Sequence, residues 1–139
     1  MHQYGVVSQE DEWGCAAACV ASLMRVDYKR AKRWLEKAKG KGIDSKPAGF
    51  EIDEIANALF EQGFKVVADW NPPEALPDGA IVCIHSRVRY QYYHYLLKVP
   101  GGYMDPWYDL LDVGKDEKRV GKFRESLPSG TRLVVALLP

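Results

Sequence analysis

The sequence lacks a long hydrophobic run and has no net charge. Its apolar stretches are the short ranges 16–24, 80–84 and 133–138, all well below the roughly 20 residues that a membrane-spanning helix needs. Nineteen basic and nineteen acidic residues cancel, so no net positive field favours non-specific nucleic-acid binding. We therefore expect neither membrane insertion nor a nucleic-acid partner.

Cysteine is scarce in this sequence. Its three cysteines are odd in number and form no Cys-x-x-Cys pair, which argues against both a disulfide framework and a structural zinc site. The first residues lack the basic-then-apolar pattern of a secretory signal. We therefore expect a cytoplasmic, reduced protein; a domain of a larger exported or delivered protein would have the same composition.

The length and composition fit one folded domain. The 139 residues are 47% hydrophobic and 27% charged, which is typical of a globular chain with a single core. We find no internal repeat, low-complexity tract or linker in the sequence. The expectation is one domain over residues 1–139, with its oligomeric state left open.

The first half of the chain has the patterns of helices. Small and apolar residues from Cys15 to about Arg25 predict a helix that is buried on most sides. Asp27 is a typical N-cap for a second helix, which ends at Gly40. A third helix is expected to end at Gly63. Its apolar face would consist of Ile52, Ile55, Ala56, Leu59 and Phe60.

The second half of the chain has the patterns of strands. Apolar, β-branched or aromatic runs cover residues 64–70, 80–85, 90–99, 103–105 and 131–138. The turn at Pro100-Gly101-Gly102 predicts a hairpin between the third and fourth of these runs. A weaker helix or a loop is expected over residues 116–126. Helices followed by an antiparallel sheet predict an α+β fold.

Cys15 is the first candidate for chemistry, because it lies where a polar segment gives way to a helix. A thiol at a helix N-terminus meets unpaired backbone N–H groups and the positive end of the helix dipole, and both favour the thiolate. The alternative is a buried core cysteine, which is the common fate of a free cysteine. Cys19 and Cys83, in the helix and in a strand, are expected to be core thiols.

A cysteine nucleophile needs a base and a group that orients the base. His94 lies at the start of the apolar part of a strand, and Asp105 follows the Gly-Gly turn eleven residues later. A hairpin can bring these two side chains together, which would fix the tautomer of the imidazole and stabilise its charged form. The alternative is that His94 belongs to an aromatic strand and that Asp105 only begins a turn before Pro106.

Taken together, these residues resemble the papain-like cysteine peptidases that process bacteriocin leaders after double-glycine sites, and their stand-alone relatives. The resemblance rests on Gln9, on Trp13-Gly14-Cys15, on His94 before an apolar strand and on Asp105-Pro106, in the order of that family. It extends over residues 9–109, and the helix expected between cysteine and histidine also fits. It implies a papain-like fold, with a helical layer packed on a bent antiparallel sheet.

The resemblance also implies a role for each residue. Cys15 would be the nucleophile, His94 the general base and then acid, Asp105 the residue that orients His94, and Gln9 the side-chain donor to the oxyanion. Trp13 and Gly14 would contribute to substrate binding. The implied activity is hydrolysis of a peptide or isopeptide bond in a peptide or protein substrate through an acyl-thioester, with neither cofactor nor metal.

Three other interpretations stay open at this point. A protein deamidase or transglutaminase, acting as an effector or toxin domain, would use the same triad. A catalytically silent module would only bind a peptide. Metal binding by Cys15, His94 and Asp105 is less favoured, because zinc ligands usually have tight local spacing. A further hypothesis is that the acidic run 10–12 and Asp109 line a cleft that favours basic substrates.

Overall fold

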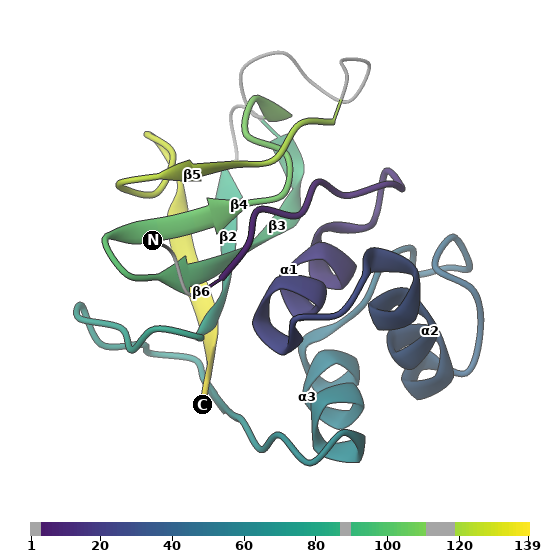
Figure 1. The fold of residues 1–139 in the computed structure, drawn as a ribbon. Coiled ribbons are helices and arrows are strands. Elements are labelled where there is room, and N and C mark those ends of the chain that lie inside the picture. Colours follow the sequence, from purple (N-terminus) through teal and green to yellow (C-terminus); the bar gives the residue numbers. More distant parts are fainter. Residues whose placement is uncertain (1–3, 87–89, 111–118) are drawn as a thin grey trace.

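A computed structural model of the chain describes residues 4–86, 90–110 and 119–139. These residues form a small α+β domain with three helices and one six-stranded antiparallel sheet (Figure 1). The helices are α1 (Cys15–Met24), α2 (Tyr28–Lys39) and α3 (Ile52–Glu61). The strands are β1 (Val67–Asp69), β2 (Ile81–Ser86), β3 (Tyr90–Val99), β4 (Gly102–Asp105), β5 (Lys122–Arg124) and β6 (Arg132–Leu138).

The three helices gather on one side of the sheet, with α1 nearest to the strands (Figure 1). The order of the strands is β1-β6-β2-β3-β4-β5, so the last strand in the sequence lies between β1 and β2. This layering confirms the predicted α+β class.

Helix α1 is the central helix because its side chains are small. Eight of its residues, from Ala16 to Leu23, are buried. Four of these are alanine or cysteine in the run 16–19, which lets the backbone approach both the sheet and the other helices. Arg25 ends the helix in the left-handed conformation, with φ of 57°. The predicted burial of this helix is confirmed.

The main core lies between the helices and the sheet. The side chains of β2 point alternately into this core and to the opposite face of the sheet. Ile81 and Cys83 face the helices, whereas Val82 and Ile84 belong to a smaller cluster that also contains Leu96 and Ala136. Both faces of β2 are therefore buried, which explains its continuous apolar sequence.

Three details differ from the sequence-based expectations. Residues 122–124, expected in a helix or loop, form strand β5, because they pair with β4 in the register Tyr103↔Arg124. Residues 116–118 of the expected helix or loop lie outside the described residues. The first expected strand is confined to Val67–Asp69. Phe60, assigned to the apolar face of α3, is 67% exposed and therefore lies outside the buried face of this helix.

All helices in the described ranges are too short, or too polar, to cross a lipid bilayer.

Candidate active site

Cys15 occupies the first position of α1 and differs in exposure from the other two cysteines. Its side chain is partly exposed, whereas Cys19 and Cys83 are buried. No side chain caps this end of the helix, and its N-cap residue is Gly14. Backbone N–H groups at an uncapped helix N-terminus favour negative charge, so the position suits a thiolate or an oxyanion.

The β3–β4 hairpin brings His94 and Asp105 together, as its sequence predicted. His94 Nε2 lies 2.7 Å from Asp105 Oδ1, and the two side chains are only 3% and 1% exposed. A hydrogen bond of this length between buried groups holds the ring in one orientation. It occupies Nε2 and leaves Nδ1 as the ring nitrogen available to another partner.

The surroundings of His94 favour the charged imidazolium. Burial alone would lower the pKa of His94, whereas the negative charge of Asp105 and the hydrogen bond to it raise it. The Cys15 side chain acts in the same direction, and together these groups raise the pKa of His94 to about 10. The imidazole is therefore protonated at neutral pH. His94 interacts electrostatically with Asp105 on one side and with Cys15 on the other.

Asp105 is held by donors on both of its oxygens. The backbone N–H of Trp107 donates to Oδ1 over 3.2 Å, and Arg124 Nη1 donates to Oδ2 over 3.0 Å. Arg124 also donates to the carbonyl of Ser126, and its guanidinium lies 4.7 Å from the ring centre of Tyr108. The carboxylate therefore cannot rotate away from His94 without breaking these contacts.

Arg124 is a site residue that the sequence did not suggest. It comes from β5, whose pairing with β4 places it next to the end of the hairpin. One of several basic residues in a region expected to be a helix or loop gives no local signal of this kind. Only the pairing of β5 with β4 shows that Arg124 reaches the carboxylate.

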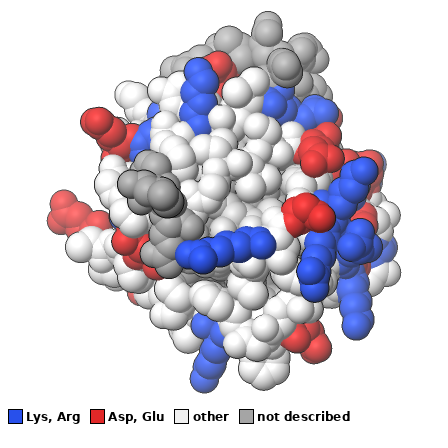
Figure 2. Space-filling model, viewed as in Figure 1, with Lys and Arg blue, Asp and Glu red and all other residues white. Residues whose placement is uncertain are grey.

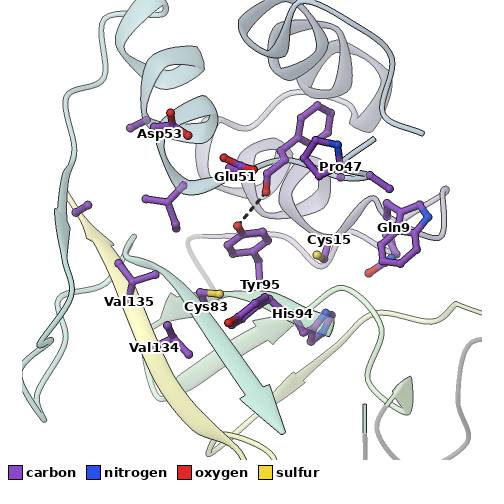
Figure 3. A pocket seen from close by; sticks show the side chains of 18 of the residues that line it. Gln9, Cys15, Pro47, Glu51, Asp53, Cys83, His94, Tyr95, Val134 and Val135 are labelled. Carbon is purple, nitrogen blue, oxygen red and sulfur yellow. Dashed lines mark hydrogen bonds between the residues drawn. The ribbon is translucent and has the colours of Figure 1, made fainter. Parts of the chain in front are cut away.

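Gln9 lies beside Cys15 (Figure 3), but its amide is oriented differently from the expectation. Its Nε2 donates to the carbonyls of Asp11 and Glu12 over 3.0 and 2.9 Å, which uses both amide hydrogens. The side chain is 3% exposed, and its Oε1 is buried without a hydrogen-bond partner. In this arrangement Gln9 offers an acceptor, so its role as oxyanion donor requires a rotation of the amide and stays a prediction.

A cavity of about 760 Å³ adjoins these residues. Gln9, Trp13, Cys15 and His94 line one end of it, and from there it extends between the segment 47–57 and strands of the sheet (Figure 3). Cys83 also lines the cavity, but burial raises the pKa of this thiol to about 12. Cys83 is therefore a neutral thiol, whereas Cys15 interacts with the imidazolium of His94.

Gly14, which was expected to bind substrate together with Trp13, does not line this cavity. A side chain at Gly14 would overlap the hydroxyl of Tyr28 on α2. That hydroxyl donates to Asp11 Oδ2 over 2.6 Å. The glycine is therefore needed for the close approach between the loop before α1 and helix α2.

The carboxylates that line the cavity are only partly those expected from the sequence, which were the acidic run 10–12 and Asp109. Glu12 lines the cavity, but Asp11 pairs with Lys32 of α2 over 3.1 Å, and Asp109 is not a lining residue. Glu51 and Asp53, at the start of α3, supply the other carboxylates of the lining. Figure 2 shows basic side chains gathered on the right of the molecule, the side of α2.

No model of a known protein family matches the chain, and no curated protein sequence is significantly similar to it. Within the part of the chain that the structure describes, no three histidine, cysteine, aspartate or glutamate side chains gather in a cluster that could hold a metal ion.

Proposed function

We propose that this protein is a papain-like cysteine hydrolase that cleaves a peptide or isopeptide bond. The proposal is carried by the buried His94–Asp105 pair, which acts electrostatically on Cys15 at the start of α1. The cavity beside Cys15 supports it further, because a macromolecular substrate needs a groove that leads to the reacting atoms.

The chemistry follows from the charge of His94. A protonated imidazole stabilises a thiolate on Cys15, and the thiolate attacks the carbonyl carbon of the substrate. When the C–N bond breaks, the imidazolium gives its proton to the leaving amine, and a C–S bond remains in the acyl-thioester. The neutral imidazole then takes a proton from water, whose oxygen displaces the sulfur and releases a carboxylic acid.

Asp105 and the N-terminus of α1 assist these reaction steps without forming covalent bonds to the substrate. Asp105 keeps the imidazole oriented and stabilises its charge in each half of the reaction. The negative oxygen of each tetrahedral intermediate would lie at the uncapped N-terminus of α1, with the backbone N–H of Cys15 as a donor. Gln9 would become a second donor if its amide rotates as the tetrahedral intermediate forms.

Selective alkylation tests the proposal. We expect iodoacetamide near neutral pH to modify Cys15 in preference to Cys19 and Cys83, because the other two thiols are buried and uncharged. His94→Ala should abolish this preference. His85→Ala, on the neighbouring strand β2, is the matched control and should preserve it.

The outcomes separate the candidate functions. Equal or absent labelling of the native cysteines would contradict a reactive Cys15. If Cys15 is reactive, mass spectrometry of the products of peptide and protein substrates distinguishes the reactions. A peptidase yields two shorter chains, whereas a deamidase yields an intact chain in which an amide has become an acid.

A further inference from the structure

The two long walls of the cavity differ in chemistry (Figure 3). One wall is formed by the segment that leads into α3 and carries Glu51 and Asp53. The opposite wall is formed by β6, with Val134 and Val135. Tyr95 lies between them, and its hydroxyl donates to the carbonyl of Phe50 over 2.9 Å. The cavity is therefore a groove with an acidic side and an apolar side.

Among the described residues that line the groove, no lysine or arginine compensates the acidic side. Apart from His94, the charged side chains that line the groove among the described residues are Glu12, Glu51 and Asp53. Lys39 lies behind the wall, where its Nζ is bonded to the carbonyls of Ile43, Ser45, Pro47 and Gly49. Both Glu51 and Asp53 are exposed, so their carboxylates are accessible to a ligand. The α3 N-terminus offsets part of this charge.

A second observation points to a ligand in the same groove. Gln9 Oε1 is buried and unpaired beside Cys15, although a buried carbonyl oxygen normally has a donor. Both hydrogens of the same amide are bonded within the loop, which holds the oxygen in this orientation. An N–H group of a bound peptide backbone would satisfy it.

We infer that the groove binds an extended peptide in which cationic and apolar side chains alternate on one side of the scissile bond. Side chains of an extended chain point alternately to opposite sides. Lysine or arginine side chains would face Glu51 and Asp53, and apolar side chains would face Val134 and Val135. In the complex before reaction, with the Gln9 amide oriented as in this structure, its oxygen would accept a backbone N–H of the peptide near the reacting carbonyl. This inference rests on the proposed function and specifies its substrate class.

Binding to a Cys15→Ala variant tests the inference independently of catalysis. Fluorescence anisotropy would compare a labelled peptide of alternating lysine and leucine with three others: one with glutamine for lysine, one with glutamate for lysine, and one of the same composition with lysines and leucines in blocks. We expect the alternating lysine peptide to bind most tightly. The glutamate peptide should bind most weakly, and the preference for lysine should fall as salt is added.

Variants of the acidic wall locate the effect. In the Cys15→Ala background, Asp53→Asn together with Glu51→Gln should weaken binding of the lysine peptide roughly three- to tenfold and leave the glutamine peptide unchanged. Asp53→Asn alone leaves the N-cap residue of α3 in place and should give a smaller loss. Glu61→Gln, at the other end of α3, is the matched control and should have no effect.

The result that overturns the inference is equal binding of the lysine and glutamine peptides, or a lysine preference that survives both substitutions. No binding of any of the four peptides would overturn it as well. A protein with a reactive Cys15 but without this preference would retain the proposed function and refute only the substrate class. Loss of Cys15 reactivity in the labelling experiment would refute the proposed function itself.

Discussion

Asp105→Asn should change how the stability of the protein depends on pH. The substitution keeps the shape of the side chain but removes the charge that faces His94. The effect is clearest in a Cys15→Ser background. In the proposed ion pair, the thiolate has lost one proton and the imidazolium has gained one, so the pair binds as many protons as the unfolded chain near neutral pH. Serine removes this compensation.

The sign and size follow from the two pKa values of His94. Its unperturbed pKa is 6.5, and in the folded wild-type protein the pKa is raised to about 10, with Cys15 supplying part of the rise. In Cys15→Ser the charge of Asp105 and the hydrogen bond to it still raise the pKa, but without the part that Cys15 supplies. A raised pKa gives a stabilisation that is complete below pH 6.5 and is lost as the pH rises through the pKa of the folded state, and between these two values the folded state binds up to one more proton than the unfolded state. The free energy of unfolding should therefore fall by up to about 1.4 kcal/mol per pH unit.

Urea unfolding followed by tryptophan fluorescence between pH 7 and 8.5 would measure this slope. The upper limit avoids pH values at which Cys19, Cys83 and Tyr28 also contribute, since the pKa of each is raised in the folded state. In the protein that carries both Cys15→Ser and Asp105→Asn, the two groups that raise the pKa of His94 are gone, and burial, which lowers this pKa, remains. The imidazole should then be neutral above pH 7, and the slope should vanish.

Asp105→Asn will also lower stability at every pH, because Arg124 loses its partner, but a uniform offset does not alter the slope. Asp109→Asn, an exposed carboxylate outside the site, is the control and should preserve the slope. Equal slopes in the Cys15→Ser protein with and without Asp105→Asn would refute the assigned coupling between Asp105 and His94.

Other consequences of the site can be measured in the same way. Wild-type protein should show a shallower slope than Cys15→Ser between pH 7 and 8.5, because an ion pair at Cys15 and His94 conserves protons; identical slopes would contradict the ion pair. Arg124→Gln should destabilise the fold by about 1–3 kcal/mol in urea unfolding and slow alkylation of Cys15, since it leaves Asp105 Oδ2 without its charged donor. Gly14→Ala should destabilise by about 1–3 kcal/mol, and adding Tyr28→Phe should recover part of this loss by removing the overlapping hydroxyl. An additive effect of these two substitutions would argue against the contact.

The parts of the site that could be predicted from sequence are those encoded locally. The change from polar to small apolar residues at Cys15 marked the helix start, and the Gly-Gly turn marked the hairpin that joins His94 to Asp105. Both signals lie within about a dozen residues of the side chains they position. Helix starts and tight turns are the features that local sequence determines most directly.

The remaining parts depend on contacts between distant segments. Arg124 reaches Asp105 only because β5 pairs with β4, and this pairing leaves little trace in a strand of three residues. The orientation of the Gln9 amide is determined by the carbonyls of the following loop. The apolar pattern of α3 located a face of the helix, but whether Phe60 on that face is covered depends on neighbouring elements.

The place of β6 in the sheet has a consequence for when the proposed active site can be completed. Because β6 lies between β1 and β2, the sheet is continuous only after residues 132–138 have left the ribosome. Cys15 is synthesised long before this point, together with the helices. A nascent chain therefore carries the thiol before the six-stranded sheet that contains His94 is complete. Under the proposed function, the order of synthesis would delay an active thiol until the strand that completes this sheet has been made.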